Sequence, residues 1–146
     1  ALPHVDYPNV DLLKWSYLKK LFLQDGEICI KSDSFKSFYS ENKDWLKPYS
    51  IFSALRERYK TSDFNKWPSY STYDSSQFAE QDCESSKLLR EADLYLFVQY
   101  HLHRQLEEAH QYAVSKKIVL KGDLPVGVDR ESSDVVISKY TFDIFS

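Results

Sequence analysis

The stretch IVLKGDLPVGVDRESSD at residues 118–134 decides how the rest of this chain is interpreted. Its first residues, Ile118 to Leu120, form a short apolar and β-branched run that is typical of a buried strand. The run ends abruptly at Gly122 and Asp123, which are residues that favour turns. In α/β barrels and open α/β sheets, active-site residues lie at the carboxyl ends of strands. The pattern therefore predicts a strand at Ile118–Leu120 with Asp123 at its carboxyl end.

The loop after this strand carries further signals. Pro125 restricts φ and Gly127 permits positive φ, so together they would fix the course of the loop. Ser132 and Asp134 either cap the helix that follows or shape the loop, and capping is the favoured role. Glu131 is predicted to be a solvated neighbour.

A long amphipathic helix is predicted just before the strand, at about residues 86–115. Apolar residues recur there with a period of 3.6, which predicts one continuous buried face made of Leu94, Val98, Leu102, Leu106, Ala109 and Ala113. On the same helix, His103, Glu107 and His110 share a face and could in principle bind zinc. The polar face of an amphipathic helix is the favoured alternative, because no fourth ligand lies nearby in sequence.

The first part of the chain predicts shorter helices. Residues 1–8 are expected to be extended, and Asn9 or Asp11 would cap a helix that ends at Asp25-Gly26. Ser32 to Ser34 offers the next N-cap. A further helix is expected from Lys47 or Pro48 to Lys60, with the proline in its first turn.

Residues 61–90 are rich in Ser, Asp, Tyr, Lys and Gln, and they are predicted to form a loop with a short helical piece. Aromatic residues make up 16% of the chain, and sugar-binding clefts use aromatic faces. Trp15, Trp45, Tyr49 and Tyr100 lie in predicted helices, where aromatics are more often core residues. Trp67, in the loop, has the least core-like context.

Four stretches of the sequence resemble one known family. Residues 121–134 resemble the first signature region of the 4-α-glucanotransferases (amylomaltase or disproportionating enzyme, glycoside hydrolase family 77). Residues 98–113 look like the helix that leads into this strand in the family, and residues 42–55 resemble an upstream helix. Residues 2–8 are similar to a segment of the plant-type cytosolic branch. The resemblance covers residues 1–135.

The resemblance implies an α/β fold, a (β/α)8 TIM barrel in which Ile118–Leu120 is strand three. A complete barrel needs about 250 residues, so the 146 residues are expected to be an internal fragment that is itself mostly helical. Residues 1–135 would be a partial catalytic domain with a loop-rich insert at 61–90. Residues 136–146 would be a tail outside the family, because Val136 stands where the family pattern has Trp.

The function implied by the resemblance is 4-α-glucanotransferase activity. The intact enzyme would transfer α-1,4-glucan segments to a sugar 4-hydroxyl by a retaining double displacement, with maltose or an α-1,4-glucan as substrate. Asp123 would face the sugar subsite beside the scissile bond, with Pro125 beside it and with Ser132 and Asp134 as secondary candidates. No metal or organic cofactor is implied.

The family's nucleophilic Asp and acid/base Glu lie on later strands, and this chain has no counterpart of either motif. Retaining enzymes need both carboxyl groups, about 5 Å apart, so the chain alone is expected to be inactive. Two alternatives stay open from the residues: a non-catalytic maltodextrin-binding protein, or a truncated remnant without function.

Composition excludes several classes of protein. The formal net charge is −3 and the pI is about 5.8, so the basic surface that nucleic-acid binding requires is not expected. Apolar runs are too short for a transmembrane helix. Cys29 and Cys83 are far apart and form no CxxC motif, which favours a reducing compartment. Together with the branch resemblance, they predict a cytosolic protein; the oligomeric state is left open.

Overall fold

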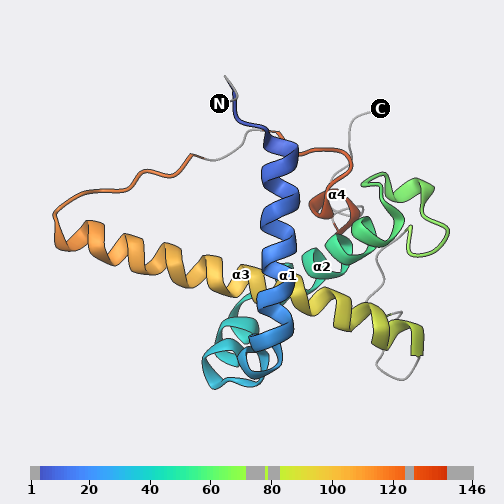
Figure 1. The fold of residues 1–146 in the computed structure, drawn as a ribbon, viewed down its shortest axis with the longest axis horizontal. Coiled ribbons are helices and arrows are strands. Elements are labelled where there is room, and N and C mark those ends of the chain that lie inside the picture. Colours follow the sequence, from blue (N-terminus) through green and yellow to red (C-terminus); the bar gives the residue numbers. More distant parts are fainter. Residues whose placement is uncertain (1–3, 72–77, 79–82, 124–126, 138–146) are drawn as a thin grey trace.

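A computed structural model describes residues 4–71, 78, 83–123 and 127–137. Within these ranges the chain forms the α-helices α1 (Tyr7–Lys31), α2 (Asp33–Tyr59), α3 (Cys83–Ser115) and α4 (Ser133–Ile137), and a 3-10 helix, η1 (Phe64–Lys66) (Figure 1). The prediction of a mostly helical structure is confirmed. None of the helices in the described ranges has a stretch apolar and long enough to cross a membrane.

Helix α1 begins earlier than predicted. Its N-cap is Asp6, whose carboxylate accepts a hydrogen bond from the backbone N–H of Asn9 at 3.2 Å. Pro8 lies in the first turn, where the N–H it lacks would have had no partner within the helix. The predicted caps at Asn9 or Asp11 are therefore wrong. Of the stretch predicted to be extended, Tyr7 and Pro8 are helical, residues 4–6 are not, and residues 1–3 lie outside the described residues.

Helix α1 also runs through Gly26, which was predicted to end it. Gly26 is buried, and a Cβ at this position would collide with the ring of Phe22. That ring packs edge-on against Phe97 of α3, with ring centroids 5.5 Å apart. The glycine therefore makes room for an aromatic ring at the crossing of α1 and α3, and the helix continues to Lys31.

A single serine separates α1 from α2. The hydroxyl of Ser32 accepts a hydrogen bond from the backbone N–H of Phe35 at 3.2 Å, which confirms the predicted N-cap. Helix α2 then continues to Tyr59 and contains Pro48, so the separate helix that was predicted to start at Lys47 or Pro48 is wrong. Pro48 is buried inside the helix, where it removes one backbone hydrogen bond.

The core has two parts, both along the contact between α2 and α3. The larger part gathers residues of α2, η1, α3, α4 and the segment between η1 and α3: Ile51, Phe52, Ala54, Leu55, Phe64, Trp67, Phe78, Leu88, Ala92, Tyr95 and Val136. The smaller part consists of Phe35, Phe38, Leu46, Leu96 and Tyr100. There Tyr100 donates a hydrogen bond to the Ser34 hydroxyl at 2.8 Å, so its polar tip is satisfied.

Trp67 is a core residue, contrary to its predicted loop-like context. Only 5% of it is exposed, and its ring packs against Phe52, Tyr59 and Phe64. Its indole N–H donates to the carbonyl oxygen of Thr61 at 3.0 Å. The short helical piece predicted within residues 61–90 is confirmed as η1, and Trp67 follows it directly.

Two predictions for the last third of the chain are wrong. Ile118–Leu120 has no regular secondary structure, and the described ranges contain no strand that could pair with it. The predicted buried face of α3 is buried only in part, because Leu102 and Leu106 are 52% and 67% exposed. This half of α3 projects past the other helices as an arm (Figure 1).

Candidate functional site

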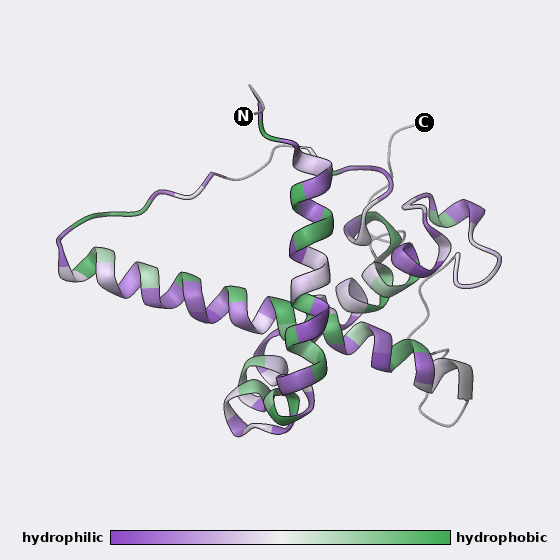
Figure 2. Ribbon diagram, viewed as in Figure 1, coloured by the Kyte–Doolittle hydropathy of each residue, from purple (hydrophilic) through white to green (hydrophobic). Residues whose placement is uncertain are grey.

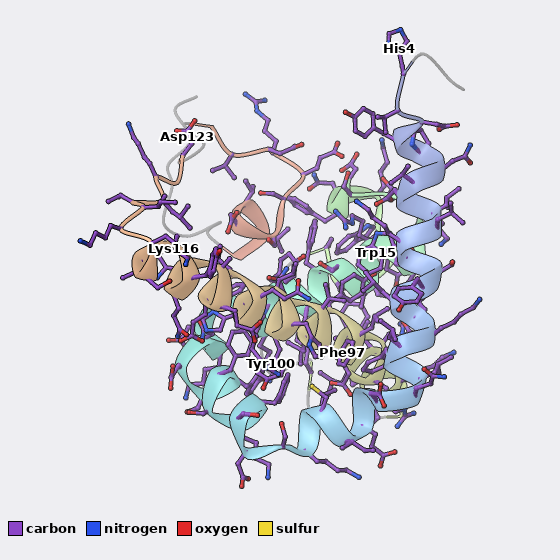
Figure 3. All side chains as sticks on the ribbon, turned by 60° about the vertical axis from the view of Figure 1, so that its left-hand side comes forward. His4, Trp15, Phe97, Tyr100, Lys116 and Asp123 are labelled. Carbon is purple, nitrogen blue, oxygen red and sulfur yellow. The ribbon has the colours of Figure 1, made fainter. Side chains whose placement is uncertain are left out.

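The candidate site is the segment that connects α3 to α4. Asp123, its main candidate residue, is exposed and makes no hydrogen bond with the residues that the structure describes. Figure 3 shows its side chain on the connecting segment, away from the packed helices. A free, exposed carboxylate can accept hydrogen bonds from the hydroxyl groups of a sugar.

A tight turn fixes the first end of this segment. Lys117 adopts a left-handed backbone with φ of 59°. The N–H of Lys117 bonds to the Val114 carbonyl, and the N–H of Ile118 bonds to the Ala113 carbonyl, both at 2.9 Å. This pair of bonds is the Schellman motif, which ends a helix and turns the chain away from its axis. Ala113 is buried at this turn, whereas the preceding residues of the arm are exposed.

Helix α4 fixes the second end. The Ser132 hydroxyl accepts a hydrogen bond from the Val135 N–H at 3.4 Å, so the favoured capping role is confirmed for Ser132. Val136 is 7% exposed and belongs to the larger core cluster. Asp134 is exposed in the first turn of α4, where a negative charge is favourable.

Glu131 adds a link that the sequence did not predict. Its carboxylate accepts a hydrogen bond from the Ser62 hydroxyl at 2.6 Å, and its backbone N–H donates to the Asp129 carboxylate at 2.9 Å. Glu131 is exposed, as predicted, but it is also tied to the loop after α2. Sequence alone offers no signal for a partner 69 positions away.

The structure does not bring the predicted site residues together. No contact joins Asp123 to Ser132 or Asp134, and Pro125 lies outside the described residues. The candidate site is therefore a segment held at both ends, with one exposed carboxylate between its anchors.

The histidines of α3 have separate surroundings. His101 lies 3.8 Å from the sulfur of Cys29, and burial lowers the pKa of its imidazole. Burial also raises the pKa of the Cys29 thiol, so this pair is neutral rather than an activated nucleophile. The ring of His103 packs on the ring of Phe38, with the two ring centroids 4.9 Å apart. Among the described residues, no group of three or more His, Cys, Asp or Glu side chains is placed to hold a metal ion.

Known proteins match nearly the whole chain. The model of the family Glyco_hydro_77, described as 4-alpha-glucanotransferase, matches residues 1–145, a range that also includes most of the predicted tail. The 4-alpha-glucanotransferase DPE2 of Oryza sativa subsp. japonica is 42% identical over 137 residues, which cover 89% of this chain and 14% of the rice protein. No solved structure matches.

Bacterial relatives match over the same region. The 4-alpha-glucanotransferase of Chlamydia caviae is 30% identical and that of Synechocystis sp. is also 30% identical. The match covers 92% and 91% of this chain, respectively. In these two relatives the chain spans 25% and 26% of the length.

Proposed function

The chain belongs to the 4-alpha-glucanotransferase family, and on that premise we propose that it supplies one section of an enzyme that transfers α-1,4-glucan segments. The observation that carries this proposal is the family match over residues 1–145. The chain spans 14% to 26% of the relatives named above, so the activity proposed is that of a longer protein.

In this proposal the reaction is a retaining double displacement. An enzyme carboxylate attacks the anomeric carbon of the donor glucan, while a second carboxylic acid gives its proton to the departing sugar oxygen. The 4-hydroxyl of an acceptor sugar then attacks the glucosyl-enzyme bond and returns a proton to the second carboxylate. Both carboxylates would lie in the part of the longer protein beyond this chain, within a TIM barrel.

The connecting segment between α3 and α4 would contribute to the donor sugar subsite. Its support is the exposed carboxylate of Asp123, held between the turn at Lys117 and the docked helix α4. Ile118–Leu120 would become a barrel strand when neighbouring strands pair with it, because it belongs to no helix or turn and its residues are 51% to 91% exposed. Asp123 would then lie at the carboxyl end of that strand.

A chimera tests this proposal. The 137 matched residues of the rice relative are replaced by the corresponding residues of this chain, and glucose release from maltose is measured with glycogen as acceptor. We expect the chimera to be active. Asp123→Asn in the chimera should lower kcat/KM by roughly 100-fold or more, because one transition-state contact would be lost.

Asp129→Asn is the matched control. Asp129 lies on the same segment, but its carboxylate accepts a local hydrogen bond from the backbone N–H of Glu131. We expect it to retain most of the activity. A folded chimera that releases no glucose, or an Asp123→Asn chimera as active as its parent, would contradict the proposal.

Cytosolic location and the absence of bound cofactors are part of the same proposal. Cys29 is a free cysteine, which supports a reducing compartment. The glucan would be the enzyme's substrate and main ligand.

A further inference from the structure

The segment that carries Asp123 depends on its two anchors, because it makes few packing contacts between them. Every described residue from 118 to 131 is exposed. A stretch of chain with few buried contacts moves easily unless its ends are held. Its first anchor, the turn at Lys117, follows the exposed half of α3. Precise placement of Asp123 therefore depends chiefly on the second anchor.

The second anchor includes a hydrogen bond across the fold. The Ser62 hydroxyl donates to the Glu131 carboxylate at 2.6 Å, and 69 positions separate the two residues in sequence. Glu131 directly precedes Ser132, whose hydroxyl caps α4. The bond therefore ties the segment to the loop after α2 at the point where α4 begins. We call these two residues the Ser62–Glu131 pair.

The loop that presents Ser62 is held in place on both sides. Before it, the Thr61 carbonyl accepts a hydrogen bond from the indole N–H of Trp67 at 3.0 Å, and Trp67 is a core residue. After it, the Asp63 carboxylate caps η1 by accepting from the Asn65 N–H at 3.2 Å. The N–H of Asp63 also donates to the Thr61 hydroxyl at 3.2 Å. The donor of the Ser62–Glu131 pair is thus tied to the packed core.

A positive charge on the same loop favours this geometry. Lys66 forms an ion pair with Asp63 at 2.9 Å. Its pKa is raised mainly by the hydrogen bond to Asp63 and further by the charge of Glu131. The ammonium group therefore attracts the Glu131 carboxylate toward the loop. A hydrogen bond that ends on a charged carboxylate is also stronger than one between neutral groups, so both contributions hold the end of the segment against the loop.

We propose that Ser62 and Glu131 are positioning residues for the transfer reaction. Their hydrogen bond holds the connecting segment so that the Asp123 carboxylate meets the donor sugar in the orientation that the transition state requires. Neither residue touches the sugar in this role. The role rests on the proposed glucanotransferase function, since it acts through Asp123.

Kinetics of the chimera with the rice relative test the proposal. Ser62→Ala removes the donor and should lower kcat for glucose release from maltose roughly fivefold, the size expected for loss of one hydrogen bond. KM should stay within about twofold, because the contact that suffers acts in the transition state. Ser37→Ala is the matched control. Ser37 also donates to a glutamate, Glu41 at 3.1 Å, but within α2, and kcat should stay unchanged.

Two variants of Glu131 separate positioning from a loss of folding. Glu131→Ala removes the acceptor and should behave like Ser62→Ala. Glu131→Gln keeps an oxygen that accepts from Ser62, so kcat should return to within about twofold of the parent chimera. Glu131 is exposed and Ser62 is half-buried, so all of these variants should fold.

A double-mutant cycle shows whether the Ser62–Glu131 pair acts through Asp123. In the Asp123→Asn chimera, Ser62→Ala should lower the remaining kcat by less than about twofold. A further fivefold loss in that background would overturn the proposal, because the effect would then be independent of Asp123. An unchanged kcat in the Ser62→Ala chimera, or equal losses in Glu131→Gln and Glu131→Ala, would also overturn it.

A measurement on the chain itself separates this proposal from the proposed function. In the 15N-labelled chain of 146 residues, the heteronuclear NOE of the amides at 127–131 should fall in Ser62→Ala and stay unchanged in Ser37→Ala. An unchanged NOE in Ser62→Ala would overturn the positioning role, whatever the activity of the chimera. A lower NOE together with a chimera that releases no glucose would support the hold on the segment and contradict only the transferase assignment.

Discussion

The two halves of α3 have the same kind of sequence and opposite surroundings. From Leu88 to Tyr100 the helix packs against α1 and α2, and Leu88 is fully buried. From Leu102 to Tyr112 its side chains are exposed, although apolar residues recur there with the same period (Figure 2). A period of 3.6 therefore shows which face of a helix is apolar, but it does not show that another element covers that face.

The largest expected effect comes from the same substitution made once in each half. Leu88→Ala should lower the free energy of unfolding by about 3 kcal/mol, because it leaves a cavity in the larger core cluster. Leu106→Ala, at a position 67% exposed, should change it by less than about 0.5 kcal/mol. Urea unfolding followed by circular dichroism measures both. Equal losses would show that the arm is as tightly packed as the inner half.

This contrast also explains how far sequence could predict the structure. Residues 86–115 were correctly predicted as one long helix, because periodicity is a local signal. Burial of Leu102 and Leu106 depends on a partner element, and the period does not contain that information. The prediction of a strand at Ile118–Leu120 was wrong for the same reason, since a strand needs a neighbour for its hydrogen bonds.

At three positions, packing overrides the local preference of a glycine, a proline or a tryptophan. Gly26 is a common stop signal, yet here it gives space to Phe22. Pro48 favours a helix start, yet it is buried within α2. Trp67 lies in a polar stretch, and only the fold reveals its place in the core. In the candidate site, the Ser132 cap was predictable from spacing, but the bond from Ser62 to Glu131 was not.

A titratable group in the inner half gives the next largest effect. Burial raises the pKa of Asp93 from 3.8 to about 6, against the opposing effect of the Arg90 charge. Between pH 3.8 and about pH 6, the folded chain therefore keeps a proton on Asp93 that the unfolded chain has already released. The stability from this group is fully present below pH 3.8 and is lost as pH rises through about 6.

Asp93→Asn should remove this loss of stability at higher pH. At pH 7 the variant should be more stable than the parent chain by about 1 kcal/mol, because solvent screens a partly exposed carboxyl. At pH 4 the two should differ little. Glu107→Gln, in the exposed half, is the matched control and should follow the pH profile of the parent. A variant that is less stable than its parent at pH 7 would rule out this role for Asp93.

The smallest effect compares the ends of two helices. Lys60 ends α2 and Lys117 follows the arm of α3, and both have left-handed backbones, with φ of 56° and 59°. Glycine adopts this conformation without steric strain, although it costs more conformational entropy on folding. Lys60→Gly should therefore raise the free energy of unfolding by about 0.5 kcal/mol.

Lys117→Gly relieves the same strain, but at the end of a helix half that makes few tertiary contacts. The arm can fray without unfolding the core, so the global free energy of unfolding should change less than in Lys60→Gly. The gain should appear instead as slower hydrogen exchange of the Lys117 and Ile118 amides, which bond to the carbonyls of Val114 and Ala113. If both variants raise global stability equally, the arm unfolds together with the core, and the two halves of α3 form one cooperative unit despite their different burial.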